Sequence, residues 1–186
     1  MQKITLFVAA MVALFVAASC GNKSKEDKVL SPNAEESASA VADSSIYGTL
    51  LDGGMNSMVL LTDDGDTLEL LRNPDDTTEV VKGGLLINDR YAVIAYTSYG
   101  DRFIRTAINI ASLKGRWSSL DRNFEIEDDG TVKSAVPTET NAWKSWSICN
   151  GQLVRGRDTF TIDELGADSM LLENREGIYS FKRAAK

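Results

Sequence analysis

Apolar and polar residues alternate along most of the chain from residue 45 onward. The alternating segments end at short clusters of Gly, Asp and Asn, a combination typical of half-buried β-strands joined by turns. In the first half of this region the pattern predicts five strands: 46–51, 57–62, 67–71, 90–97 and 102–111. An apolar stretch at 80–87, with two glycines inside it, is interpreted as a connector. Five strands in so short a region predict a small β-barrel.

The rest of the chain contains shorter segments of the same kind. Here the pattern predicts eight strands: 117–120, 124–127, 131–135, 143–149, 152–155, 159–165, 169–173 and 178–183. Almost every link between them is short, and Asn150-Gly151 is a strong two-residue hairpin signal. Strands joined by short links pair with their neighbours, and an eight-stranded meander that closes on itself has no unpaired edge. We therefore expect an antiparallel eight-stranded barrel.

The expected fold class is all-β, with two barrels in series. The layout of the first resembles an OB-fold or SH3-like barrel. The chain divides accordingly into four parts: residues 1–19, residues 20–44, residues 45–112 for the small barrel and residues 113–186 for the eight-stranded barrel.

The start of the last part resembles a known family. Gly115-Arg116-Trp117 is similar to the Gly-x-Trp signature of lipocalins, and Arg183 stands near the chain end, where lipocalins place a basic residue on that Trp. An Arg plane over an indole ring contributes about 0.5–2 kcal/mol. The patterns FEIEDDGTV, WSICNGQL and DTFTIDELGADSMLL also resemble the short lipocalin-like domain of many bacterial lipoproteins. The resemblance implies that Gly115, Trp117 and Arg183 close a lipocalin-like barrel that binds a ligand or partner.

The pattern of the first twenty residues predicts a targeting signal. Lys3 is followed by an uncharged run over residues 4–19, which has the length of a signal-peptide apolar region. The run ends in Ala17-Ala18-Ser19-Cys20, which resembles the lipobox of bacterial lipoproteins. The resemblance implies a lipoprotein signal peptide at 1–19, fatty acylation at Cys20 (palmitate or a similar chain) and a membrane anchor. The alternatives are an uncleaved anchor helix or an ordinary secretory signal with a chance Cys.

Residues 20–44 are expected to form a disordered tether, because they contain too few large apolar residues to offset chain entropy. A short helix around residues 33–42 is the alternative. Gly21 follows Cys20, so the Asp of an inner-membrane retention signal is absent at this position. Ser24-Lys25-Glu26-Asp27 resembles the tract that directs some lipoproteins to the outer face of the outer membrane; the alternative is a solvated charged linker. We expect a cell-envelope protein anchored in the outer membrane, facing the periplasm or the cell surface.

Composition excludes several classes of site. The chain has 20 Lys and Arg against 27 Asp and Glu, a net charge of −7, which speaks against nucleic-acid binding because such binding depends on basic side chains. It has no His, which removes Ser-His and Cys-His pairs and His-metal sites. The acidic groups at 63–66, 75–76 and 128–129 lack EF-hand spacing, and Asp is a common turn residue, so we expect no metal. Cys149 is expected to be a buried, unreactive thiol. We predict no enzyme and no cofactor.

The candidate binding residues are aromatic. Trp143 and Trp146 lie three apart in one predicted strand, so they point to opposite faces, one into the core and one towards a barrel mouth. Tyr179 is a further candidate. The leading hypothesis is a lipid-anchored binding protein for a small apolar or glycan ligand or for an envelope protein partner. The alternative is a structural or inhibitory protein-interaction module whose filled barrel takes no small ligand; an envelope hydrolase is the third hypothesis.

The state of the second barrel's interior separates the first two hypotheses. A solid core would count against a small ligand inside the barrel, whereas a cavity of a few hundred cubic ångströms would favour one. The side chains expected there are Trp117, Phe124, Ile126, Trp146, Phe160 and Phe181.

Overall fold

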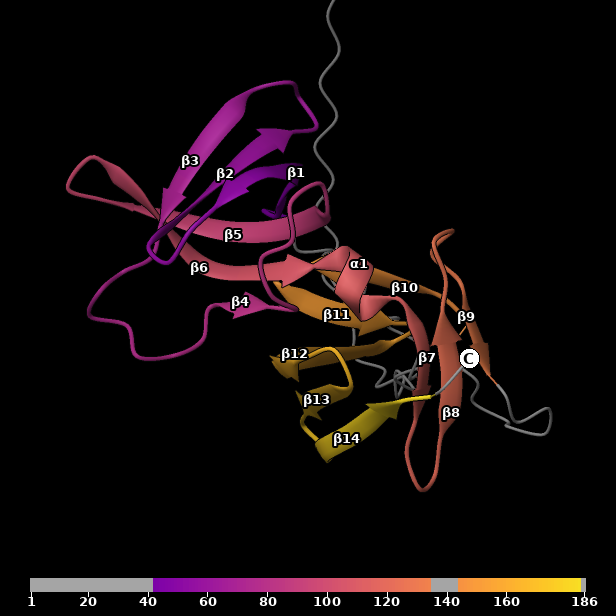
Figure 1. Cartoon of the computed structure of the whole chain (residues 1–186). Coiled ribbons are helices and arrows are strands. Elements are labelled where there is room, and N and C mark those ends of the chain that lie inside the picture. Colours follow the sequence, from indigo (N-terminus) through magenta and orange to yellow (C-terminus); the bar gives the residue numbers. More distant parts are fainter. Residues whose placement is uncertain (1–41, 135–143, 185–186) are drawn as a thin grey trace, which may run out of the picture. The chain divides into compact units, whose positions relative to one another are not determined.

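The computed structural model describes residues 42–134 and 144–184, and residues 41–186 form one compact unit. The predictions for the signal peptide, for Cys20, for the tether up to residue 41 and for Trp143 lie outside the described residues. The described part is all-β, as predicted, with a closed five-stranded barrel and a nearly closed eight-stranded antiparallel barrel (Figure 1).

The first barrel is built from five strands: β1 (Ile46–Gly53), β2 (Ser57–Thr62), β3 (Thr67–Leu71), β5 (Arg90–Ser98) and β6 (Asp101–Asn109). They pair in the order β3-β2-β1-β5-β6, and a parallel contact between Leu71 of β3 and Phe103 of β6 closes the ring. The predicted connector at 80–87 contains the two-residue strand β4 (Val81–Lys82), which joins the edge of β6 in parallel.

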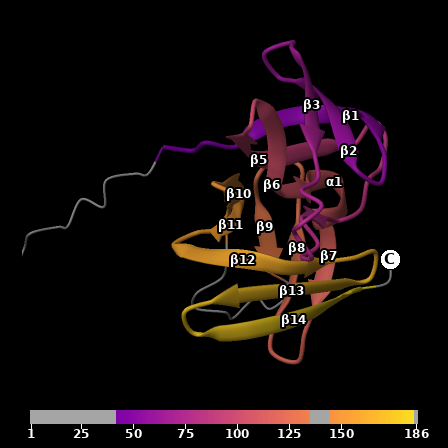
Figure 2. The same ribbon diagram turned by 90° about the vertical axis from the view of Figure 1, so that its left-hand side faces the viewer.

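The second barrel is a meander of eight strands: β7 (Gly115–Ser118), β8 (Asn123–Ile126), β9 (Val132–Ser134), β10 (Trp146–Cys149), β11 (Gln152–Arg155), β12 (Asp158–Leu165), β13 (Ser169–Asn174) and β14 (Gly177–Arg183). The last strand pairs with the first through Arg183 and Trp117, and Figure 2 shows β12, β13 and β14 running side by side. The order runs from β10 to β9, and these two ends meet at a single bridge between Thr131 and Ser145, so the barrel is nearly closed.

The predicted strand 102–111 is wrong at its end, because the chain turns into the short helix α1 (Ile110–Leu113). Asn109 is fully buried and caps this helix: its Oδ1 accepts a hydrogen bond from the Ser112 backbone N–H at 3.0 Å, and its Nδ2 donates to the Tyr91 hydroxyl at 3.0 Å. Ile110 and Leu113, three apart, then face the same way and are both buried. The buried cap therefore ends the strand at Asn109, although the alternating pattern of the sequence continues beyond it.

The core of the second barrel extends beyond its own strands. Its cluster of buried apolar side chains includes Ala92 of β5 and Ile108 of β6, together with Ile110 and Leu113 of α1. A separate cluster fills the first barrel, around side chains such as Leu50, Tyr91 and Ile104. The two barrels therefore share apolar packing where they meet.

The turn between β10 and β11 packs closely against the first barrel. Gly151 has φ +74°, and a Cβ there would lie 2.6 Å from the Thr106 Cγ2 atom and 3.1 Å from the Ile94 Cγ1 atom. Only glycine combines this left-handed backbone with so close an approach. The Asn-Gly turn thus serves two purposes: it reverses the chain and it seats the hairpin on β5 and β6.

Candidate functional site

Trp117 and Arg183 close one end of the second barrel. The Trp117 side chain is 1% exposed, and its indole N–H donates a hydrogen bond to the Leu113 carbonyl oxygen at 2.8 Å. The Arg183 guanidinium carbon lies 4.2 Å from the Trp117 ring centroid, and its Nη1 donates to the Lys114 carbonyl oxygen at 2.8 Å. The arrangement is a stacked, hydrogen-bonded clamp with a structural role.

Gly115 is required by the same clamp. Its φ is +114°, a region that side-chain-bearing residues rarely adopt. A Cβ at this position would lie 2.8 Å from the Arg183 Nη1 atom. The three residues singled out by the lipocalin resemblance therefore lie together in space and hold β7 to β14.

Aromatic rings occupy the interior of the second barrel. Phe124, Phe160 and Phe181 are each at most 4% exposed, and the rings of Phe124 and Phe181 meet edge to face at 5.1 Å. Arg155 is fully buried, with its guanidinium carbon 3.8 Å from the Phe124 ring centroid. Because these groups contact one another, they form a packed cluster among the described residues. Phe124, with Trp117, also lines a pocket of about 590 Å³ whose lining comes mainly from β7, β8 and β9.

Sequence reasoning did not single out Arg155. The signal was present, because Arg155 lies two residues after Leu153 in β11 and so shares its inward face. An Arg at an inward position of a strand indicates a charge that the fold accommodates by ring stacking or pairing.

The aromatic binding candidates are not gathered into one site. Trp146 is half-buried; its indole N–H donates to the Glu127 carbonyl oxygen at 2.7 Å, which fixes the ring. Tyr179 is also half-buried and meets Phe160 edge to face at 5.7 Å. Trp146 lines a pocket in which Tyr179 has no part, and Trp143 is outside the described residues.

That pocket, the inter-barrel pocket, lies where the two barrels meet and has a volume of about 380 Å³. Its lining includes Tyr47, Arg90, Ile110, Lys114, Trp146 and Ile148, which come from β1, β5, α1, the residue after α1, and β10. Ile110 and Ile148 are 8% and 4% exposed and form an apolar base. A volume of this size is within the range of small-molecule sites, which often lie between domains.

The charges around the inter-barrel pocket are paired in two different ways. Arg90 makes a two-point ion pair with Asp63, with Nη1–Oδ1 2.8 Å and Nη2–Oδ2 2.5 Å, and its guanidinium carbon lies 5.7 Å from the Tyr47 ring centroid. Lys114 Nζ contacts the Asp128 carboxylate, whose side chain is 86% exposed. The first pair is held in a fixed orientation, whereas the second reaches into solvent.

Tyr47 joins the pocket to the start of the folded unit. Its hydroxyl donates to the Ile148 carbonyl oxygen at 2.6 Å and also lies 3.1 Å from the Asp43 Oδ2 atom. Burial, together with the hydrogen bond and negative charge of Asp43, raises the pKa of Tyr47 to about 12. Partial burial alone would raise the pKa of Asp43, but hydrogen bonds from the Asn150 and Ser45 backbone N–H groups outweigh it and leave that pKa lowered.

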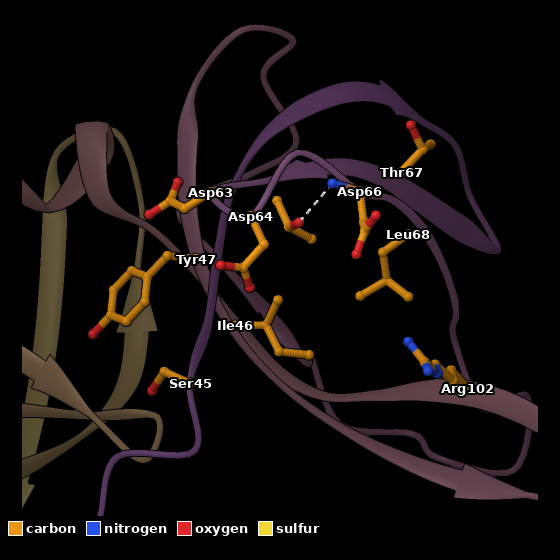
Figure 3. Close-up of a pocket in the computed structure, with 10 residues that line it drawn as sticks. Ser45, Ile46, Tyr47, Asp63, Asp64, Asp66, Thr67, Leu68 and Arg102 are labelled. Carbon is orange, nitrogen blue, oxygen red and sulfur yellow. Dashed lines mark hydrogen bonds between the residues drawn. The ribbon is translucent and has the colours of Figure 1, made fainter.

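A larger pocket of about 630 Å³ lies on the first barrel (Figure 3). Its acidic groups, Asp63, Asp64 and Asp66, come from the β2–β3 turn, where the Asp66 backbone N–H donates to Thr62 Oγ1 at 3.1 Å. In Figure 3 the Tyr47 ring points away from Asp64 and Asp66. Within the described residues, no group of three or more acidic or Cys side chains could hold a metal ion. We therefore assign Asp64 and Asp66 to turn geometry, whereas Asp63 also pairs with Arg90.

Cys149 is half-buried and carries a free thiol, which accepts a hydrogen bond from Asn150 Nδ2 at 3.6 Å.

Among the described residues, no helix has the length and apolar character needed to cross a membrane. A scan against models of known families, a search of curated proteins and a search of solved structures each returned no match.

Proposed function

We propose that this chain is a lipid-anchored cell-envelope protein that binds a small apolar or glycan ligand in the inter-barrel pocket. The observation that carries the proposal is the position of Trp146: its ring is fixed by Glu127 at the edge of a 380 Å³ pocket above Ile110 and Ile148. Apolar walls with a few oriented polar groups are typical of ligand sites.

The filled interior of the second barrel supports this location. A lipocalin-like ligand would lie inside the barrel, but Phe124, Phe160 and Phe181 occupy that space among the described residues. The inter-barrel pocket, with a volume of about 380 Å³, lies outside this packed cluster and has room for a small ligand. The same observation favours a second candidate, a protein-interaction module without a small ligand.

A titration with octyl glucoside separates the two candidates, because this probe carries both an apolar chain and a sugar ring. Nuclear magnetic resonance of the unlipidated chain 21–186, which keeps the whole compact unit, should show shifts confined to the Trp146 indole N–H, Ile110 and Ile148. Trp146→Ala should weaken binding at least tenfold. If the probe shifts no pocket signal at concentrations below its micelle threshold, the interaction module becomes the better proposal.

The anchor is proposed from the lipobox and is tested independently. Cys20→Ala should leave the protein in the aqueous phase of a detergent partition, whereas the unmodified protein should enter the detergent phase with two or three acyl chains, each buried CH₂ contributing ~0.8 kcal/mol. Cys149→Ala is the matched control and should partition like the unmodified protein. Equal partitioning of the Cys20 variant would contradict lipidation and leave the ligand site untouched.

A further inference from the structure

We infer that the ligand of the inter-barrel pocket is an anion, a carboxylate or phosphate attached to an apolar body, with Lys114 as its counter-ion. This inference rests on the proposed function. The pocket lining carries two cations, Arg90 and Lys114, against one anion, Asp128, in a chain whose net charge is −7. Arg90 is already balanced by Asp63, so Lys114, whose partner Asp128 is 86% exposed, is the cation of this lining that a ligand can reach.

Lys114 is held ready for such a contact. It caps the C-terminus of α1 as the residue that follows the helix: its backbone N–H donates to the Ile110 carbonyl oxygen at 3.3 Å, and its own carbonyl accepts from Arg183. Its backbone is thus fixed from both sides, and its side chain lines the inter-barrel pocket as well as a neighbouring pocket that includes Glu127 and Asp129. An ammonium on a fixed backbone can orient a ligand head group over the apolar base formed by Ile110 and Ile148.

The present partner of Lys114 is easily displaced. Asp128 lies in the β8–β9 turn with its side chain 86% exposed, and solvated ion pairs of this kind contribute little. Its neighbour Asp129 is different: its carboxylate accepts from the Thr131 backbone N–H at 2.9 Å and from the Thr131 hydroxyl at 2.6 Å. The turn thus keeps its shape through Asp129, and Asp128 can leave Lys114 without disturbing it.

Arg90 has the opposite character. Both of its terminal nitrogens bind Asp63, and the guanidinium lies near the Tyr47 ring, so it forms a wall of the pocket whose charge is already balanced. A cationic ligand would have to lie beside the Lys114 ammonium, which the exposed Asp128 balances. An anionic ligand replaces Asp128 on Lys114 and meets no buried carboxylate in the lining.

The test uses probes that share one apolar body and differ in the head group: octanoate, octyl phosphate, octanol and octylamine. Calorimetry on the unlipidated chain 21–186 should show octanoate or octyl phosphate binding at least tenfold more tightly than octanol, and octylamine most weakly. The ratio of octanoate to octyl phosphate distinguishes a carboxylate ligand from a phosphate ligand. Raising the salt concentration should narrow the gap between charged and neutral probes.

Three variants assign the effect to Lys114. Lys114→Met should remove the preference for anionic probes while leaving octanol binding unchanged. Lys114→Arg should retain most of the preference for anionic probes. Asp128→Asn should strengthen anion binding severalfold, because it removes the competing carboxylate. Lys133→Met is the matched control: this lysine pairs with Glu127 outside the pocket lining and should leave all four affinities unchanged.

The outcomes separate this inference from the proposed function. Octanol binding equal to octanoate binding, or tightest binding of octylamine, overturns the anionic ligand while the pocket remains a ligand site. No binding of any octyl probe overturns the proposed function itself. Thermal unfolding of each variant shows whether a lost affinity reflects a lost fold.

Discussion

Replacing Trp117 by Ala is the sharpest test of the second barrel's architecture. The side chain is 1% exposed, stacks on Arg183 and donates to the Leu113 carbonyl oxygen. Truncation of a buried Trp to Ala costs about 3–5 kcal/mol. Loss of the hydrogen bond and of the stacking on Arg183 costs about 1 kcal/mol more, which places this variant in the upper part of that range. We expect a loss of about 4–5 kcal/mol in the free energy of unfolding.

Urea unfolding followed by circular dichroism measures this loss. For a chain of this length each kcal/mol lowers Tm by about 2–4 °C, so Trp117→Ala should lower Tm by ~8–20 °C. Trp117→Phe, which keeps most of the packing but removes the indole N–H, should cost only about 1–2 kcal/mol. Because Ala92 and Ile108 of the first barrel belong to the same core cluster, both barrels should unfold in one transition.

Trp146→Ala is the comparison. Because this ring is only half-buried at the pocket edge, its removal should lower the free energy of unfolding by less than about 2 kcal/mol. A loss under about 1.5 kcal/mol for Trp117→Ala would refute the clamp between Trp117 and Arg183. Two separate transitions would refute the shared core.

Two further predictions concern the junction of the barrels. Gly151→Ala should lower the free energy of unfolding by about 2 kcal/mol, because it combines an unfavourable φ of +74° with a Cβ 2.6 Å from Thr106. Gly156→Ala, at φ +63° with open space around it, should lower it by only about 1 kcal/mol. Equal losses in chemical unfolding would contradict the close packing of Gly151. Asp43 has a pKa lowered below its ordinary 3.8, so its stabilising hydrogen bonds are fully present above pH 3.8 and are lost as the pH falls towards the folded-state value. Asp43→Asn should therefore destabilise the protein more at pH 7 than at pH 3 in urea unfolding, and a pH-independent difference would contradict this sign.

Local sequence predicted most of the strands and the turns that join them. The alternation and the turn residues predicted β2, β3 and β11 with their observed bounds, and Asn150-Gly151 predicted the β10–β11 hairpin. These features depend on neighbours within a few residues, because the period of two and the φ preferences of Asn and Gly act locally. The same reasoning extended β6 too far, since the hydrogen bonds that hold the Asn109 side chain in place as a helix cap involve Asp89 and Tyr91, which lie 20 and 18 residues earlier in the chain.

Only the tertiary structure brings together the residues of the proposed ligand site. The inter-barrel pocket joins Tyr47, Arg90, Lys114 and Trp146, which are tens of residues apart and share no periodic pattern. In the same way, the packed cluster inside the second barrel depends on contacts between rings from β8, β12 and β14. Alternation predicts that these rings point inward, but it does not predict which of them touch. Sequence periodicity specifies which face of a strand is apolar, whereas a site needs the long-range packing that brings several such faces together.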